Sequence, residues 1–377
     1  MAEPFKNLLN AELVRAAGRH LHRVWPAFDR TRFERLAIDG LQALELKARV
    51  EHVALALEAV LPASFAAAAR VLERSLAPAR LDADLSALVP GPDGLAGWAV
   101  WPMTEFVARR GLDEPRRALQ ALHAMTQRNT AEYAIRPFLL RHPELAFATL
   151  RSWVTDPSPH VRRLVSEGSR PRLPWGMQLK PLIADPSPTL PLLDALQHDP
   201  SDYVRRSVAN HWNDISKDHP QLVAEWLERH LAAASPELRA LMKRASRTLV
   251  KCCDRRVLRA WGLGRAFQGT AMLAMSPKRV RAGGAVTLAA TLRSTAAQTQ
   301  RLVVDYAVQH VKRAGNGKAA KVWKGWSLEL PPRQQRVLEK RHSMRPVTTR
   351  RDRPGRHRVE LRVNGRVVAS SHFDLLA

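Results

Sequence analysis

The chain has 377 residues, of which 60 are lysine or arginine and 35 are aspartate or glutamate, so its formal net charge is +25. Hydrophobic residues make up 45% of the chain, a fraction that is ordinary for a folded protein and argues against disorder. So large a positive charge predicts a polyanionic partner, which means nucleic acid or an anionic membrane surface. The length is sufficient for two domains.

No segment is long and apolar enough to span a bilayer. The longest apolar run, residues 52–69, is interrupted by Glu58 and Pro62 and falls short of the ~20 residues that a span needs. The N-terminus has no basic region followed by an apolar one, so no signal peptide is expected. Cys252 and Cys253 are adjacent and form no CxxC motif. We therefore expect a cytoplasmic protein with no membrane partner, no metal and no cofactor.

Residues 1–268 are predicted to be helical. Apolar side chains recur at helical spacing in residues 115–128, 142–156 and 219–234, and proline and aspartate mark the starts of these segments. No convincing alternation of apolar and polar residues, the pattern typical of strands, is found in this part of the chain.

The helical part contains internal repeats. The sequence DPSPHVRRLV (156–165) returns as DPSDYVRRSV (199–208), a shift of 43 residues, and HPEL (142–145) returns as HPQL (219–222), a shift of 77. Repeats of about 40 residues built from two helices are typical of HEAT-like arrays, which stack into a solenoid with a concave binding face. Chance similarity between amphipathic helices is disfavoured, because the Asp-Pro-Ser start and the Val-Arg-Arg core recur together.

From residue 270 the pattern changes to alternating apolar and polar residues. Asn364 and Gly365 form a two-residue hairpin signal between two such runs. About seven strands in the last ~105 residues favour an immunoglobulin-like sandwich. We therefore predict a multidomain protein, with an all-α HEAT-like solenoid over 1–268 followed by an all-β immunoglobulin-like sandwich over 270–377. The stretches in which apolar and polar residues alternate are 279–294, 300–312, 321–330, 333–344 and 355–376.

The second domain carries most of the excess positive charge, with 22 lysine and arginine residues against 6 aspartate and glutamate residues over 270–377. Its richest stretch is 341–358, in which Arg350 and Arg351 are predicted to contact DNA phosphates. A plain solvated surface is the alternative. Contacts of this kind supply affinity without sequence selection and weaken steeply with salt. We expect this domain to be a basic DNA-binding domain.

A cationic loop follows the helix predicted over 159–168. Arg163 and Glu167 lie four residues apart and share a face of that helix. Gly168 is predicted to end the helix in a left-handed conformation. The loop then carries Arg170, Arg172 and Trp175, stiffened by prolines.

Acidic and aromatic residues recur near the helix ends of neighbouring repeats. Trp212 and Asp214 lie at the end of the next repeat, and Glu132 lies near the start of a helix one repeat earlier. Because equivalent positions of successive repeats line one groove, we expect Glu132, Glu167 and Asp214 to converge there. Trp175 and Trp212 are expected to flank them.

Carboxylates in a basic groove repel DNA phosphate, so their presence there indicates a cationic ligand. An alkylated base is cationic, and breaking its glycosidic bond develops positive charge on the sugar. Carboxylates and tryptophan faces stabilise such charge, and the arginines would hold the flanking phosphates. The structural alternatives are a plain Arg163–Glu167 helix pair, tryptophans that only pack between repeats, and Asp214 as a helix cap. No lysine is expected among these residues, so hydrolysis is favoured over a Schiff-base step.

The stretches SEGSRPRLPW (166–175) and VANHWNDISKDHP (208–220) resemble the AlkC family of bacterial DNA alkylation-repair glycosylases, and the resemblance extends over the whole chain. It implies removal of N-alkylated bases such as 3-methyladenine and 3-methylcytosine from double-stranded DNA, without full extrusion of the base. It also implies that Glu167 is the principal catalytic carboxylate and that Glu132 and Asp214 belong to the lesion site. Arg163, Arg170 and Trp175 would contact the surrounding DNA.

Two other functions fit the composition. A non-catalytic HEAT-repeat scaffold that binds nucleic acid would have the same charge and groove, and a protein-binding solenoid would have the same fold. We expect a monomer with no obligate protein partner, because no self-complementary apolar face is evident. Its expected location is the cytoplasm, at the bacterial nucleoid.

Overall fold

The structure is a computed structural model that describes residues 5–81, 84–310, 320–345 and 353–376. The chain folds into two compact units, Met1–Asp218 and His219–Ala377. Among the described residues, no helix is long and apolar enough to cross a membrane. Arg350 and Arg351 lie outside the described residues, so their predicted role stays a prediction.

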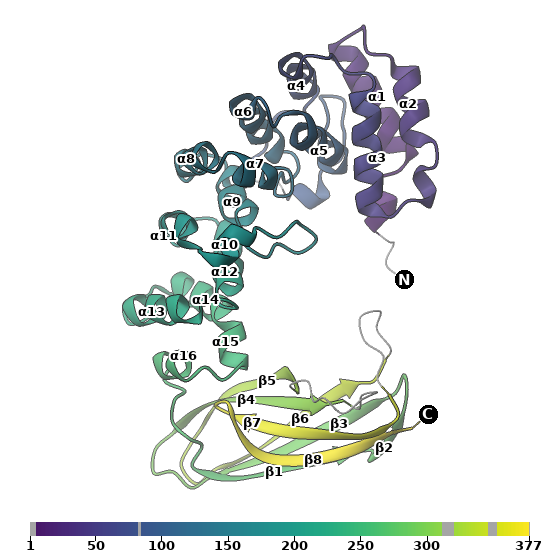
Figure 1. The fold of residues 1–377 in the computed structure, drawn as a ribbon. Helices are drawn as coiled ribbons and strands as arrows, with labels where there is room; N and C mark the ends of the chain where they lie inside the picture. The colour runs from purple at the N-terminus through teal and green to yellow at the C-terminus, as the bar shows by residue number, and fades with distance from the viewer. Residues whose placement is uncertain (1–4, 82–83, 311–319, 346–352, 377) are drawn as a thin grey trace. The chain divides into compact units, whose positions relative to one another are not determined.

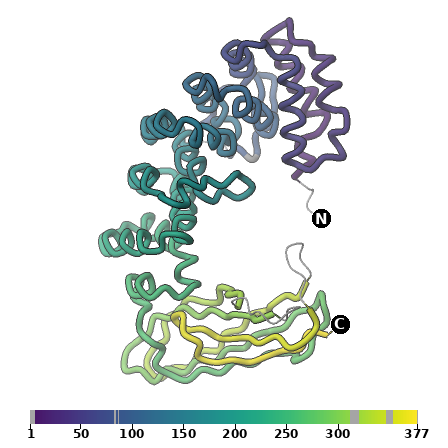
Figure 2. The backbone as a smooth tube through the Cα atoms, in the orientation of Figure 1, coloured from purple at the N-terminus to yellow at the C-terminus, as the bar shows by residue number. Residues whose placement is uncertain are grey.

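The first unit is built of helices, as predicted (Figure 1). In the backbone trace of Figure 2 the helices of this unit follow one another in space in their order along the chain, which is typical of a repeat fold. The helices are α1 (Ala11–Val24), α2 (Arg30–Ile38), α3 (Leu46–Glu58), α4 (Phe65–Arg74), α5 (Trp101–Arg110), α6 (Pro115–Thr126), α7 (Arg136–Arg141), α8 (Pro143–Trp153), α9 (Pro159–Gly168), α10 (Lys180–Ala184), α11 (Leu190–Leu196) and α12 (Asp202–Ile215).

The Asp-Pro-Ser repeat forms the same turn each time. In both copies the aspartate side chain accepts the backbone N–H of the serine two residues on, at 2.8 Å, and so opens the following helix. The first arginine of Val-Arg-Arg then donates back to the backbone carbonyl of that aspartate, at 2.8 and 2.6 Å. The pairs are Asp156 with Arg162 in α9, and Asp199 with Arg205 in α12. The first arginine of the motif is therefore structural, which leaves the second free to have another role.

Gly168 does not end α9 in the left-handed conformation that the sequence predicted. It continues the helix, and Ser169, with φ −91°, is the C-cap residue. The reason for glycine is steric, because a Cβ at this position would lie 2.6 Å from Cγ2 of Ile135. Gly168 thus allows the end of α9 to approach the segment that precedes α7.

In its described residues, the second unit contains four helices and two sheets. The last helix ends at Ala260 and the first strand begins at Gly269. The helices are α13 (Pro220–His230), α14 (Pro236–Ala245), α15 (Arg247–Lys251) and α16 (Arg255–Ala260). The strands are β1 (Gly269–Ser276), β2 (Arg279–Arg281), β3 (Ala285–Ser294), β4 (Gln300–Gln309), β5 (Lys321–Leu330), β6 (Gln335–Ser343), β7 (Gly355–Val363) and β8 (Arg366–Leu376).

The strands form the predicted immunoglobulin-like sandwich. One sheet has the order β1-β3-β6 and the other the order β2-β8-β7-β4-β5, in which only the short β2–β8 pair, among the described strands, is parallel. The core lies between the sheets, where Leu288 of one meets Tyr306 and Phe373 of the other. The predicted hairpin joins β7 to β8, with φ of 47° at Asn364 and 79° at Gly365.

Candidate active site

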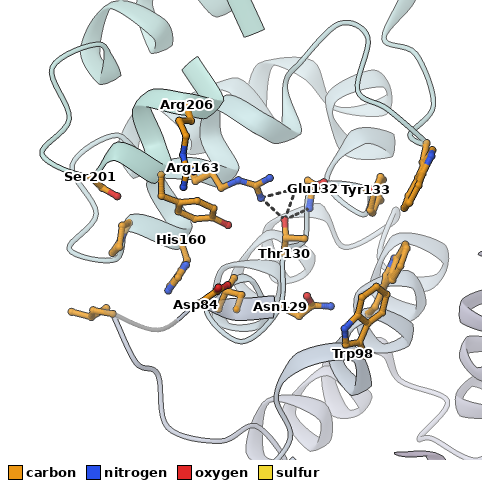
Figure 3. Close-up of a pocket in the computed structure, with 16 residues that line it drawn as sticks. Asp84, Trp98, Asn129, Thr130, Glu132, Tyr133, His160, Arg163, Ser201 and Arg206 are labelled. Atoms are coloured by element: carbon orange, nitrogen blue, oxygen red, sulfur yellow. Dashed lines mark hydrogen bonds and ion pairs between the residues drawn. The ribbon is translucent and has the colours of Figure 1, made fainter. Parts of the chain in front are cut away.

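A pocket of about 610 Å³ lies within the first unit, between the start of α5 and the starts of α9 and α12. Figure 3 shows Trp98 and Tyr133 on one side of it, Ser201 and Arg206 on the other, and Glu132 between them. The aromatic side is a packed layer: Tyr133 stacks on Trp101 with ring centroids 5.2 Å apart, and Trp101 meets Trp98 at 5.6 Å. The pocket therefore combines flat apolar walls with a few charged groups, as ligand sites commonly do.

Glu132 places a carboxylate on the wall of this pocket. It lies in the turn just before α7, where Thr130 donates its hydroxyl to Oε2 at 2.7 Å. Arg163 of α9 donates Nη1 to the same oxygen at 2.6 Å (Figure 3). The guanidinium of Arg163 also lies 4.9 Å from the ring centroid of Tyr203 in α12, a cation–π contact. The turn before α7 and the helices α9 and α12 thus fix one carboxylate at the pocket surface.

The three predicted acids are joined by arginines into an alternating series that we call the charge chain. Arg163 bridges Glu132 to Glu167, whose Oε1 lies 3.6 Å from Nη2. Arg170 bridges Glu167 at 2.6 Å to Asp214 at 2.8 Å. Lys217 ends the series with a 2.9 Å contact to Asp214. The charge chain is Glu132, Arg163, Glu167, Arg170, Asp214 and Lys217.

Burial and the neighbouring charges have opposite effects on the pKa of the central acid of the charge chain. Only 5% of Glu167 is exposed, and burial alone raises the pKa of its carboxyl. Arg163 and Arg170, together with a 2.6 Å hydrogen bond from Ser207, outweigh that effect and hold the pKa below its ordinary value. Burial raises the pKa of Tyr133 to about 12, with the neighbouring Glu132 adding to the shift. Glu167 is therefore ionised at pH 7, and Tyr133 is neutral.

Arg136 holds the loop that carries Trp175. It is completely buried and donates to the carbonyl of Gly168 at 2.8 Å and to that of Met177 at 2.8 and 2.5 Å. Burial lowers the pKa of Arg136 to about 10. Trp175 itself is 62% exposed, lines the pocket and has φ of 63°, a left-handed conformation that is costly for a tryptophan. Lys47 donates to its carbonyl at 2.8 Å.

The structure brings the three predicted acids together but not equally close to the pocket. Glu132, Arg163 and Trp175 line it. Glu167, Asp214 and Arg170 are not among its lining residues, and each is buried behind Arg163 in the charge chain.

The other predicted residues have separate surroundings. Arg172 forms a two-bond pair with Asp218, at 2.8 Å for each bond. Trp212 is 5% exposed and lies in the helix core rather than at the pocket. Lys217 joins the cluster through Asp214, contrary to the expectation that no lysine would, although it does not line the pocket.

Several lining residues were missed by the sequence analysis, and the repeat contained the signal for three of them, His160, Tyr203 and Arg206. His160 and Arg163 of α9 correspond, at the 43-residue shift, to Tyr203 and Arg206 of α12, and all four line the pocket. The rings of His160 and Tyr203 meet edge to face at 5.8 Å. In this motif the second arginine faces the pocket while the first holds the Asp-Pro-Ser turn. Trp98 and Trp101 had no such signal.

No group of three or more histidine, cysteine, aspartate or glutamate side chains in the described part of the chain is arranged to hold a metal ion.

Two family models match the chain. One, described as DNA alkylation repair enzyme, matches residues 124–248, and the other, described as the C-terminal Ig-like domain of the uncharacterised protein YhaZ, matches residues 269–377. The chain is 33% identical over 376 residues to the uncharacterized protein YhaZ of Bacillus subtilis, which covers 98% of this chain and 99% of that one. It is also 36% identical, with a TM-score of 0.89 and full coverage of both chains, to the Pseudomonas fluorescens alkylpurine DNA glycosylase AlkC, solved bound to DNA containing an abasic site analog. The chain belongs to the AlkC family.

Membership of the AlkC family makes the chain a DNA glycosylase of the alkylation-repair type and confirms the resemblance seen in the sequence. The first family model spans Glu132, Glu167 and Asp214, so the whole charge chain lies within the region that defines the alkylation-repair domain. The second spans the sandwich. The AlkC architecture of helical repeats followed by an immunoglobulin-like domain is thus present in full.

Proposed function

We propose that the protein hydrolyses the N-glycosidic bond of N-alkylated, cationic bases in double-stranded DNA, with 3-methyladenine and 3-methylcytosine as substrates, and so leaves an abasic site. The observation that carries the proposal is the carboxylate of Glu132 on the wall of an aromatic-lined pocket in a member of the AlkC family. The similar AlkC structure is named an alkylpurine DNA glycosylase and holds DNA with an abasic site analog, which is consistent with 3-methyladenine as a substrate and with an abasic product. The glycosidic bond is cleaved, by attack on the sugar, without full extrusion of the base.

The proposed reaction needs charge stabilisation more than acid catalysis. A cationic base leaves with the electron pair of the glycosidic bond and becomes neutral, so no general acid is needed. Positive charge then develops at C1′ of the sugar, where the Glu132 carboxylate stabilises it. A water adds to C1′ and transfers a proton to the carboxylate. The aromatic faces of Trp98 and Trp175 attract the cationic base before the bond breaks.

The contacts favour a division of labour among the three acids. Glu132 is the one that lines the pocket, so we propose it as the carboxylate that touches the substrate. Glu167, which the sequence analysis ranked first, acts through Arg163 by setting the position and charge of that guanidinium. Asp214 is more distant from the pocket, and it sets the position and charge of Arg170, which in turn contacts Glu167.

The rest of the proposal concerns DNA binding. The helical part, residues 1–268, is proposed to hold the lesion, and the basic domain, residues 270–377, to bind the DNA backbone. We propose that the protein acts as a monomer in the cytoplasm, at the nucleoid, without a cofactor or obligate protein partner. The proposed DNA contacts are Arg163, Arg172, Trp175, Arg350 and Arg351, whereas the buried Arg170 and Trp212 support this surface from within.

The test measures base release and DNA affinity on the same variants. Methylated duplex DNA is incubated with excess enzyme and the released bases are quantified; affinity is measured on a duplex with an abasic analogue. Glu132→Gln should lower the rate of 3-methyladenine release by about 10²–10³-fold, the usual cost of removing one transition-state contact, with DNA affinity roughly unchanged. Glu167→Gln should also abolish most release. Glu144→Gln, an exposed acid of α8, is the matched control and should behave as the wild type.

The scaffold alternative differs mainly in what it predicts for base release. A phosphate-binding groove gains affinity when it loses a negative charge, so Glu132→Gln and Glu167→Gln would bind DNA as well as the wild type or better, and none of the three proteins would release a base. Full release by both variants would show that the charge chain has no part in the reaction.

A further inference from the structure

A second pocket, of about 520 Å³, lies entirely within the second unit. One wall is formed by α14, α15 and the segment after α16, and the other by β4 and β5 of the sandwich. We call it the strand–helix pocket. Its residues are distinct from those of the pocket that Glu132 lines, and its volume lies in the range of small-molecule sites.

A stripe of four cations borders the helical wall. Arg239 and Lys243 of α14 and Arg247 and Lys251 of α15 follow one another at intervals of four residues, and all line the pocket. Arg239 and Lys243 share a face of α14, and Arg247 and Lys251 share a face of α15; like charges four residues apart on one helix repel each other, which costs about 0.2–0.5 kcal/mol per pair. Such a stripe is unfavourable in the free protein, and an anion placed beside it relieves the repulsion.

The opposite wall adds two further cations, and the pocket has few carboxylates to offset them. Arg301 of β4 pairs with Glu329 at 3.4 Å, while Lys324 of β5 lies on the same wall. The other lining carboxylate, Asp305, is buried and accepts the backbone N–H of Gly325 at 3.0 Å. Six lysine and arginine side chains therefore face two carboxylates, so the pocket is electropositive at its rim.

The interior of the strand–helix pocket is apolar and contains an aromatic ring. Trp261 lies between α16 and the first strand and is held in place by a 3.0 Å hydrogen bond from Nε1 to the hydroxyl of Ser246. Leu263 and Leu328 line the pocket beside it. A wholly charged ligand would leave these surfaces unused, whereas a flat ring with an attached anion would use both parts of the pocket.

We propose that the strand–helix pocket binds a single nucleoside phosphate, with its unpaired base against Trp261 and the leucines and its phosphate on the stripe of cations. The buried Asp305 carboxylate repels the phosphate and so favours this orientation, with the phosphate at the rim and the neutral base inside. Bases in an intact duplex cannot enter, because their faces are covered by their neighbours. The ligand is therefore either an unpaired nucleotide of a DNA strand or a free nucleotide. The proposal does not depend on the proposed glycosylase reaction.

The experiment measures binding of two probes to the full-length protein in the absence of alkylated DNA. The probes are deoxyadenosine monophosphate and a hairpin duplex with a single-stranded overhang. Lys243→Gln combined with Lys251→Gln removes two charges of the stripe from exposed positions. Arg255→Gln combined with Arg259→Gln removes two exposed charges from α16, outside the pocket lining, and is the matched control.

The lysine pair should weaken binding of at least one probe about tenfold or more and reduce its salt dependence, and the arginine pair should change it less than twofold. Loss of nucleotide binding identifies a free nucleotide as the ligand. Loss confined to the overhang probe identifies the DNA strand. The proposal is overturned if neither probe binds the wild type, if both pairs weaken binding equally, or if inorganic phosphate competes as well as the nucleotide, since the base would then contribute nothing.

Discussion

Protonation of His211 should cost the protein stability at mildly acidic pH. His211 of α12 is completely buried, and its Nδ1 contacts the carbonyl of Ser166 in α9 at 2.9 Å, while its Nε2 has no hydrogen-bond partner. Burial lowers the pKa of this histidine from 6.5 to about 4. Since the folded state disfavours the charged ring, the stability that the neutral ring provides is fully present above pH 6.5 and is lost as the pH falls toward 4.

The magnitude follows from the shift. One pKa unit corresponds to about 1.36 kcal/mol, so a shift from 6.5 to about 4 is worth about 3 kcal/mol below both values and about 2 kcal/mol at pH 5. His211→Asn keeps an N–H donor for Ser166 and removes the titration. The free energy of unfolding, measured by urea at pH 7.5, 6 and 5, should therefore fall about 2 kcal/mol further in the wild type than in His211→Asn.

The absolute stability of His211→Asn is lower at every pH, because asparagine fills less of the site, so the slope with pH is the informative quantity. His198→Asn replaces an exposed histidine and should keep the wild-type slope. Parallel loss of stability in the wild type and His211→Asn would refute the reasoning, since it would show that other groups carry the acid sensitivity.

Three further substitutions test the site and the fold. Arg170→Met leaves Glu167 and Asp214 buried without their shared cation and should lower the free energy of unfolding by about 3–5 kcal/mol, measured by chemical denaturation; a loss below 1 kcal/mol would contradict the bridging role. Trp175→Gly removes a left-handed tryptophan that costs about 1–2 kcal/mol and is mostly exposed, so the melting temperature should stay the same or rise while affinity for DNA falls; an unchanged affinity would count against Trp175 as a contact. Gly365→Ala should destabilise the sandwich more than Gly283→Ala, since both have positive φ but only the first would place a Cβ 2.6 Å from Cβ of Cys253; equal melting temperatures would show that the strand hairpin yields.

Local pattern was sufficient for much of the fold. α9 occupies residues 159–168 as predicted, because a proline at the first position and apolar residues at helical spacing are both local signals. The Asn364-Gly365 hairpin was predictable for the same reason, since two adjacent residues determine the turn. The repeat at 43 residues correctly indicated that α9 and α12 begin in the same way.

The site was only partly predictable, because its bonds join distant residues. The Arg163–Glu167 pair was visible from spacing, but the bridge from Arg170 to Asp214 spans 44 residues and depends on how α9 packs against α12. Glu167 was ranked first because of its motif, whereas access to the pocket belongs to Glu132, and only tertiary packing decides that. The left-handed backbone of Trp175 had no signal, since that conformation normally indicates glycine or asparagine.

The charge chain has a consequence for how mutants of this family are interpreted. Each member neutralises its neighbours, so deleting any one leaves an adjacent ion uncompensated, and single knockouts should converge on similar defects whichever residue performs the chemistry. Replacing a bonded acid and base together by neutral residues leaves no uncompensated charge. The defect that remains then reports the loss of the reacting group alone. If substitutions of Arg170 and Asp214 show strong epistasis while substitutions of Glu132 and Asp214 show weak epistasis, the reacting carboxylate lies at the Glu132 end of the charge chain.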